Sequence, residues 1–185
     1  MNARGFWTEK HETETHLFDE SLCKAMMDSV PHNFSWVDIG CGNGAYTIYL
    51  RDAGINCIGY DGNPQTEEIT GGLCKVMDFS MPQFIGKFDI VLSLEVGEHI
   101  PQGYESIFLN NLRDACREFL IISWAIEGQP GVGHVNTRNN DYIIKELENR
   151  GFSYCKEASD LLRDKSTLPW FKNTLMVFEK LLIYF

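Results

Sequence analysis

The chain of 185 residues lacks long hydrophobic runs, and this absence argues against an integral membrane protein. No stretch approaches the ~18 consecutive apolar residues that a membrane-spanning helix needs. The N-terminal residues, MNARGFWTEKHETETH, also lack the apolar core of a signal peptide. We therefore expect a protein with no membrane contact that resides in the cytoplasm.

The sequence also lacks paired cysteines. Its six cysteines are separated by 16 residues or more and form no Cys-x-x-Cys pair: Cys23, Cys41, Cys57, Cys74, Cys116 and Cys155. This spacing excludes a zinc ribbon and a compact disulfide scaffold. Cys57 and Cys74 lie in apolar runs, where a thiol is usually a small buried hydrophobe. The pattern favours free thiols in a reducing, intracellular compartment.

Positive charge is scarce, because 26 acidic residues face 16 basic ones and the net charge is −10. Such a surface repels phosphate backbones and anionic membranes, so nucleic acid is disfavoured as a partner. The hydrophobic share of 44% and the charged share of 23% are typical of globular proteins. The length predicts one domain over residues 1–185, with a helical or lid segment at 1–30 and a core at 31–185.

Strand-length apolar runs alternate with segments of helical pattern. Strands are expected at seven places: 34–40, 55–61, 74–79, 88–95, 119–125, 153–157 and 174–183. Helices are expected at 10–29, 44–53, 102–116 and 139–150, with a short one ending at Thr70. Helices between strands act as crossover connections. The pattern therefore predicts an α/β fold whose sheet is mostly parallel and carries helices on both faces.

A glycine-rich loop, DIGCGNG at 38–44, follows the first strand and opens a helix. Its glycines allow a tight turn and let a ligand approach the backbone N–H groups. The letters also fit the dinucleotide fingerprint, with Ala45 in its last position. However, Asp38 would repel a diphosphate and attract a cationic ligand. Asp61 ends the second strand, where it can bind ribose hydroxyls.

With these features, the sequence from about residue 36 to residue 180 resembles the class I S-adenosylmethionine-dependent methyltransferases. The resemblance rests on DIGCGNG, the acid of GYDGNP, the pair Asp78 and Phe79, and TLMVFEK as the last strand. It implies a Rossmann-like, seven-stranded, doubly wound sheet whose last strand is antiparallel. It also implies S-adenosylmethionine as cofactor and S-adenosylhomocysteine as product.

The resemblance assigns parts of the cofactor to parts of the chain. The glycine loop would pack on the methionine half, Asp61 would bind the ribose, and Asp78 or its neighbours would contact the adenine. The residues implied in cofactor binding are Asp38, Gly40, Cys41, Gly42, Asn43, Asp61, Gly62, Asn63, Asp78, Phe79, Leu94 and Glu95. Trp7, His11 and His16 either fold over the cofactor or belong to a solvated tail. For the helix expected at 10–29, packing is favoured over a lid.

Two carboxylates and an imidazole follow the fourth strand, at the mouth of the expected site. Their spacing brings Glu95, Glu98 and His99 to one side of a single helical turn, which Pro101 keeps short. The fourth and fifth strands should be neighbours, so the loop EGQPGVGHVN can bring His134 to His99. Such ligands suit a divalent ion, for example Mg²⁺ or Mn²⁺, and leave about two positions open for vicinal hydroxyls.

This Glu-x-x-Glu-His set with a distant histidine is similar to that of two metal-dependent groups, the small-RNA 2′-O-methyltransferases and the ubiquinone-pathway O-methyltransferases. The resemblance implies that Glu95, Glu98, His99 and His134 hold the ion. The RNA group fits poorly, because this chain is acidic and has no added RNA-binding domain. Two metal-free interpretations stay open: the Glu-His pair shapes the acceptor pocket, or His134 acts as a general base.

We therefore predict methyl transfer to an oxygen of a small molecule or sugar with neighbouring hydroxyls, assisted by a divalent ion. Glu98, His99 and His134 are the expected catalytic residues, and the protein is expected to be a monomer or a homodimer. Three alternatives are a metal-free N-, O- or C-methyltransferase, a catalytically silent binding subunit and a nicotinamide-dependent oxidoreductase.

Other residues near the expected site have two interpretations each. Trp124 either walls the acceptor site or belongs to the core. Asn136 and Arg138 either contact the acceptor or form a turn and a helix cap. For residues 170–172, packing is favoured over a role in the site.

Overall fold

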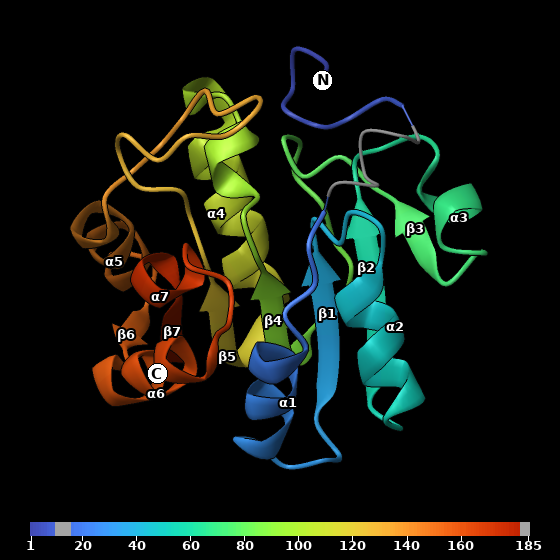
Figure 1. Cartoon of the computed structure of the whole chain (residues 1–185). Coiled ribbons are helices and arrows are strands. Elements are labelled where there is room, and N and C mark those ends of the chain that lie inside the picture. The colour runs from blue at the N-terminus through green and yellow to red at the C-terminus, as the bar shows by residue number, and fades with distance from the viewer. Residues whose placement is uncertain (10–15, 182–185) are drawn as a thin grey trace.

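The computed structural model describes residues 1–9 and 16–181. A seven-stranded sheet of order β3-β2-β1-β4-β5-β7-β6 forms its centre (Figure 1). The strands are β1 (Ser35–Ile39), β2 (Asn56–Asp61), β3 (Cys74–Val76), β4 (Phe88–Ser93), β5 (Cys116–Ile122), β6 (Phe152–Tyr154) and β7 (Met176–Lys180). Strand β7 runs antiparallel to both of its neighbours, β5 and β6, and the other strand pairs of this sheet are parallel. The predicted α/β fold and its antiparallel last strand are thus confirmed.

The central strands are apolar because both of their faces are covered. On one face, Val37 of β1 pairs with Val91 of β4, which pairs with Leu120 of β5. On the other face, Trp36 lies opposite Ile90. All five side chains are fully buried. The sheet therefore separates two hydrophobic cores, one on each side.

Helices cover both cores, as expected for a doubly wound sheet. The helices are α1 (Glu20–Asp28), α2 (Ala45–Asp52), α3 (Thr66–Ile69), α4 (Gln102–Ala115), α5 (Asn140–Glu148), α6 (Lys156–Lys165) and α7 (Phe171–Thr174), together with the 3₁₀ helix η2 (Gly97–His99). Buried residues of α4 and α5 belong to one core, and those of α1, α2 and α6 belong to the other. In Figure 1, α1 and α2 lie in front of the sheet and α4 behind it. None of the described helices is both long and apolar enough to span a membrane.

The first helix is shorter than predicted, and the expected part at 10–15 lies outside the described residues. Helix α1 begins after Asp19, whose carboxylate accepts a hydrogen bond from Leu22 N at 3.0 Å. The other carboxylate oxygen accepts the hydroxyl of Ser166 at 2.6 Å. Met26 and Met27 are buried, in agreement with the packing role favoured for this helix, whereas Leu17 precedes the helix and is 59% exposed. Helix α1 is therefore a packing element.

The C-terminal quarter departs most from the prediction. The strand expected at 153–157 ends at Tyr154, and the next residues form α6, which the strand pattern missed. Helix α6 is rich in helix formers, and Lys156 pairs with Asp160 one turn later. The last strand begins at Met176 because α7 precedes it, and residues 182 and 183 of its predicted range lie outside the described residues.

The sheet order places the candidate residues at one edge. Strand β1 lies between β2 and β4, so the connections after β1 and β4 leave toward opposite sides of the sheet. A crevice forms at the carboxyl ends of strands where such a reversal occurs. The glycine loop, the turn after β4 and the loop after β5 all meet there.

Candidate active site

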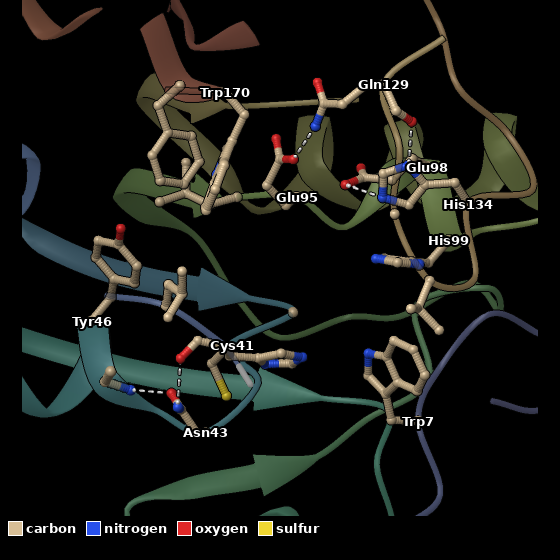
Figure 2. A pocket seen from close by; sticks show the side chains of 18 of the residues that line it. Trp7, Cys41, Asn43, Tyr46, Glu95, Glu98, His99, Gln129, His134 and Trp170 are labelled. Carbon is tan, nitrogen blue, oxygen red and sulfur yellow. Dashed lines mark hydrogen bonds and ion pairs between the residues drawn. The ribbon is translucent and has the colours of Figure 1, made fainter. Parts of the chain in front are cut away.

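A cavity of about 610 Å³ opens at the carboxyl ends of β1 and β4 (Figure 2). A smaller cavity of about 70 Å³ adjoins it near the end of β2. Both cavities are bordered by Trp7, His16, Gly40, Glu95 and His99. The two cavities together form one elongated site that crosses the glycine loop.

Hydrogen bonds hold the glycine loop against the neighbouring strand β2. The amides of Gly40 and Cys41 both donate to the carbonyl of Tyr60, at 2.8 and 3.0 Å. Gly40 has a φ of 81°, and a Cβ there would lie 2.3 Å from the side chain of Val96. Only glycine fits this position, because both the backbone conformation and the space exclude a side chain.

Two buried acids flank the loop. Asp38 accepts the hydroxyl of Thr47 at 2.8 Å, and burial raises the pKa of Asp38 to about 7. Asp61 accepts the amides of Gly42 and Asn63, each at 2.8 Å. Burial raises the pKa of Asp61 as well. Asp61 therefore ties the glycine loop to the end of β2.

Ten of the twelve residues predicted to bind the cofactor line one of the two cavities. The larger cavity is lined by Asp38, Gly40, Cys41, Asn43, Leu94 and Glu95. The smaller cavity is also lined by Asp61, Gly62, Asp78 and Phe79. The other two predicted residues, Gly42 and Asn63, stand behind the surface and bind Asp61 through their amides.

The N-terminal segment covers the smaller cavity, and Figure 1 shows it above the carboxyl ends of the strands. Arg4 donates to the carboxylate of Asp78 at 2.7 Å. The ring of Phe6 lies so close to Gly62 that a Cβ at Gly62 would approach it to 2.5 Å. Trp7 packs against His99 with ring centroids 5.7 Å apart. Of the three aromatic residues discussed above for this segment, Trp7 and His16 border the site, and His11 lies outside the described residues.

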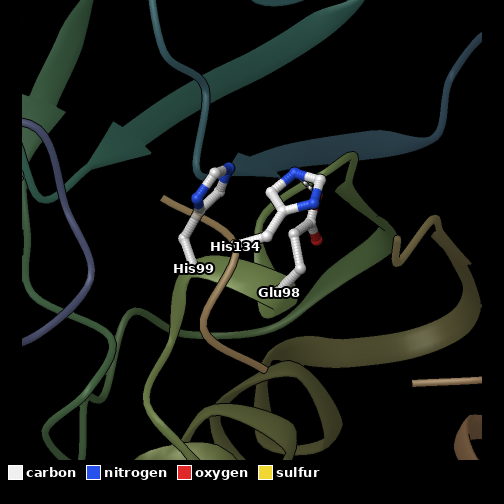
Figure 3. Close-up of side chains that lie close together, drawn as sticks. All are labelled: Glu98, His99 and His134. Atoms are coloured by element: carbon white, nitrogen blue, oxygen red, sulfur yellow. Dashed lines mark ion pairs between the residues drawn. The ribbon is translucent and has the colours of Figure 1, made fainter. Parts of the chain in front are cut away.

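Three of the four predicted metal ligands come together (Figure 3). Glu98, His99 and His134 each place one candidate donor atom within 4.8 Å of the others. Glu98 is fully buried, and neither of its carboxylate oxygens has a hydrogen-bond partner in the described part of the chain. Burial, with the nearby charge of Glu95, raises the pKa of Glu98. Burying a charged carboxylate without a partner is energetically unfavourable, so Glu98 is expected to bind a cation or to carry a proton.

Both histidines are oriented by backbone carbonyls. His99 Nδ1 lies 3.1 Å from the carbonyl of Gly133, and His134 Nδ1 lies 3.2 Å from the carbonyl of Gln129. These contacts assign the proton to Nδ1 and leave Nε2 with a free lone pair, the arrangement found around metal-bound histidines. Burial lowers the pKa of His99 to about 4, so this imidazole is neutral at physiological pH.

Glu95 stands outside this group, contrary to the single-turn prediction. Turn η2 begins at Gly97, after Glu95, which has a left-handed φ of 53°. The carboxylate accepts the side-chain amide of Gln129 at 2.9 Å and the hydroxyl of Thr174 at 3.4 Å. In Figure 2 it lies on the side of the cavity toward Trp170, away from His99. The turn is short, as expected, but of the three predicted ligands it contains only Glu98 and His99.

Comparison with known proteins agrees with this geometry. A family model described as a methyltransferase domain matches residues 11–118. The chain belongs to the methyltransferase domain family. The resemblance to class I S-adenosylmethionine-dependent methyltransferases is thereby confirmed, and the oxidoreductase alternative is disfavoured. No curated protein sequence matches this methyltransferase.

Several solved methyltransferases share the fold. Magnesium protoporphyrin IX methyltransferase from Synechocystis, with bound S-adenosylmethionine, is 19% identical, with a TM-score of 0.65 over 92% of this chain and 79% of that one. An N-methyltransferase from Bradyrhizobium japonicum, bound to S-adenosylhomocysteine, is 16% identical, with a TM-score of 0.62 over 86% and 83%. The 1,6-didemethyltoxoflavin-N1-methyltransferase from Burkholderia thailandensis is 14% identical, with a TM-score of 0.59 over 88% and 78%. At these identities the likeness shows the fold alone.

Trp124, Asn136 and Arg138, which had two interpretations each, have structural roles and do not line the site. Trp124 is core, because it is fully buried and its ring lies 2.1 Å from a Cβ built at Gly97. Asn136 and Arg138 both donate to Glu105, at 2.8 and 2.9 Å, and do not line either cavity.

Four further residues line the larger cavity, although the sequence pattern did not assign them to the site. The larger cavity is also lined by Tyr46, Gln129, Trp170 and Phe171. Tyr46 lies in the first turn after the glycine loop and Gln129 in the loop of His134, so their positions held a usable signal. Phe171 begins α7 and Trp170 directly precedes it, and the sequence pattern did not reveal this helix.

Proposed function

We propose that this methyltransferase moves the methyl group of S-adenosylmethionine to an oxygen of a small molecule or sugar with neighbouring hydroxyls. A divalent ion, Mg²⁺ or Mn²⁺, would be held by Glu98, His99 and His134. The observation that carries the metal part is the fully buried Glu98 carboxylate, which lacks a hydrogen-bond partner in the described chain and faces two oriented imidazoles.

The two adjoining cavities lie where the cofactor would bind. The methionine half would lie in the larger one along Gly40 and Cys41, and the adenosine half would extend from it toward the smaller one. Asp61 would bind the ribose, and Phe79 would border the adenine. Asp38 and Glu95 border the larger cavity, and a cationic sulfonium ligand bound there would favour the charged form of both carboxyls. The cofactor supplies an electrophilic methyl group when it is bound.

The donor set fits a divalent ion of intermediate hardness. One carboxylate and two imidazole nitrogens are ligands that Mn²⁺ and related ions accept, and hydroxyl oxygens of the acceptor could fill open positions. An ion held by these residues would lower the pKa of an acceptor hydroxyl. Glu95 could join as a fourth ligand only by leaving Gln129.

The residues of the cavity would orient the acceptor. Tyr46, Trp170 and Phe171 offer aromatic walls that exclude water, and Glu95 with Gln129 offers a polar pair between these walls and the ion site. Holding the acceptor oxygen in line with the methyl group accounts for much of the rate in such a transfer. The acceptor is therefore expected to be a small molecule, and not a membrane component or a nucleic acid.

A metal-free methyltransferase is the second candidate. The distance of 3.9 Å between His134 Nε2 and Glu98 Oε1 favours it, since a carboxylate near an imidazole can support a general base. In that case Glu98 must be protonated or share a proton with His134, because burial disfavours its isolated charge.

A calorimetric titration of Mn²⁺ into chelator-stripped protein, with and without S-adenosylhomocysteine, distinguishes these candidates. Saturable binding at one site that vanishes in Glu98→Gln is the expected result. Full turnover in the presence of a chelator would instead select the metal-free enzyme. If the protein does not bind S-adenosylhomocysteine, the result would favour a catalytically silent binding subunit.

A further inference from the structure

The loop that carries His134 has little regular structure of its own. It connects β5 to α5 and contains Gly128, Gly131 and Gly133. The partner of His134 Nδ1 is the carbonyl of Gln129, which belongs to the same loop. That bond orients the ring within the loop, but it does not fix the loop relative to Glu98. Some other contact must do so.

Besides the contact between His99 Nδ1 and the carbonyl of Gly133, such contacts lie one and two residues after His134. The amides of Val135 and Asn136 both donate to the carbonyl of Glu98, each at 2.9 Å. The loop is therefore bonded directly to the backbone of the turn that carries the buried carboxylate.

Asn136 is held from three sides. Its side-chain amide donates to Glu105 Oε2 at 2.8 Å, and its carbonyl accepts the indole N–H of Trp124 at 2.7 Å. Its own amide supplies the bond to Glu98. The residue is 4% exposed and cannot reach either cavity.

Glu105 is a fixed partner for Asn136. It projects from α4, is 6% exposed, and accepts further hydrogen bonds from Arg138 and from the hydroxyl of Tyr142. The guanidinium of Arg138 also lies 4.8 Å from the ring centroid of Tyr142. A buried carboxylate with this many donors has one position, so it is a rigid anchor.

We propose that Asn136, anchored by Glu105, is a positioning residue that holds His134 opposite Glu98 and so sets the geometry of the ion site. This inference rests on the proposed function. It makes α4 a second support of the site, although Glu105, Asn136, Arg138 and Tyr142 line neither cavity. Outer residues that orient metal ligands typically change metal affinity about 10- to 100-fold when they are removed.

The test compares Asn136→Ala with Asn111→Ala, which is a matched control. Asn111 is also a buried asparagine, at 6% exposed, and its side chain lies on α4. It anchors a different loop, because its amide donates to the carbonyls of Phe79 and Met81 at 2.9 and 2.8 Å. Each variant removes one buried anchor, but only Asn136 is bonded to the turn of Glu98.

Mn²⁺ affinity is measured in the presence of S-adenosylhomocysteine, and the affinity for S-adenosylhomocysteine is measured separately. We expect Asn136→Ala to weaken Mn²⁺ binding by about 10-fold or more and to keep S-adenosylhomocysteine affinity within about 2-fold. Asn111→Ala should keep the Mn²⁺ affinity of the unaltered protein. If Asn136→Ala does not fold, Asn136→Ser serves in its place, because it keeps a short polar side chain.

A swapped pair separates positioning from general destabilisation. In the double variant Glu105→Gln/Asn136→Asp, the amide and the carboxylate exchange places, and part of the lost Mn²⁺ affinity should return relative to Asn136→Asp alone. Unchanged Mn²⁺ affinity in Asn136→Ala, or an equal loss in Asn111→Ala, would overturn the inference.

Failure of the proposed metal step gives a different result. The unaltered protein would then bind S-adenosylhomocysteine but not Mn²⁺, and the position of His134 would be followed by its imidazole NMR resonance. A shift in Asn136→Ala but not in Asn111→Ala would keep the positioning role. Identical His134 resonances in all three proteins would refute the positioning role of Asn136.

Discussion

His134 Nε2 lies 3.9 Å from Glu98 Oε1, although the two residues are far apart in the sequence and come from different loops. Glu98 is fully buried, and the described residues supply no hydrogen bond to its carboxylate. Glu98 and His134 can therefore bind a third partner between them, either a cation or a proton. Four predictions follow from this site and its surroundings.

Glu98→Gln should abolish Mn²⁺ binding and keep S-adenosylhomocysteine binding. The variant keeps the shape of the side chain and removes the charge that the ion needs. It should also unfold at no lower temperature than the metal-free unaltered protein, because it removes an uncompensated buried carboxylate. The measurements are calorimetric titration and thermal unfolding in a chelator. The exposed Glu157→Gln on α6 is the control, and retained Mn²⁺ affinity in Glu98→Gln would refute the ligand assignment.

Gly131→Ala should weaken Mn²⁺ binding without changing the backbone conformation. Gly131 does not have a positive φ, but a Cβ there would lie 2.1 Å from His134 Nε2 and would push the ring aside. Gly103→Ala is the matched control, because its Cβ would meet nothing within 4 Å. That control lies in α4 and should gain about 0.4–1 kcal/mol of stability. Equal Mn²⁺ affinities in the two variants would show that His134 does not bind the ion.

Phe6→Ala should weaken S-adenosylhomocysteine binding by about 5- to 10-fold, because it removes apolar contact from the cover of the smaller cavity. Phe84→Ala provides the comparison, since Phe84 is 93% exposed and should leave binding unchanged. Fluorescence or calorimetric titration measures both. A Phe6→Ala protein with full affinity would mean that the N-terminal segment does not cover the bound cofactor.

Asp38 should make the free energy of unfolding depend on pH. Burial raises the pKa of Asp38 from 3.8 to about 7 in the folded protein. The folded state therefore keeps a proton that the unfolded chain has lost, and the Asp38 contribution to stability falls as the pH rises from 3.8 to about 7. Asp38→Asn, which can still accept the hydroxyl of Thr47, should flatten this slope in denaturant unfolding.

The control for this slope is Asp89→Asn. Although burial raises the pKa of Asp89, hydrogen bonds from Ser35 and Arg117 outweigh that effect and hold it below its usual value. Its contribution to stability is therefore lost only below pH 3.8, as the pH falls toward the lowered pKa. Between pH 5 and pH 7, Asp89→Asn should keep the slope of the unaltered protein. An unchanged slope in Asp38→Asn would contradict the assignment of the effect to Asp38.

Local pattern was sufficient for much of the fold. The central strands are buried on both faces, so their apolar runs are continuous and easy to recognise. The glycine loop is equally local, because its turn depends on residues that tolerate a positive φ. Helices α6 and α7 were missed because their buried faces are defined by contact with the other core residues, and short segments carry little periodic signal.

The sheet, the glycine loop, the acids at the strand ends and the approach of His134 to His99 can be predicted from the chain alone, since each follows from strand order or from neighbouring residues. The direction of the Glu95 side chain toward Gln129 and Thr174, which lie 34 and 79 residues away, is visible only in the folded protein. The same holds for Asn136, whose side chain donates a hydrogen bond to Glu105 and lines neither cavity. The direction of a side chain depends on partners that packing brings together, and spacing along the chain does not encode those partners.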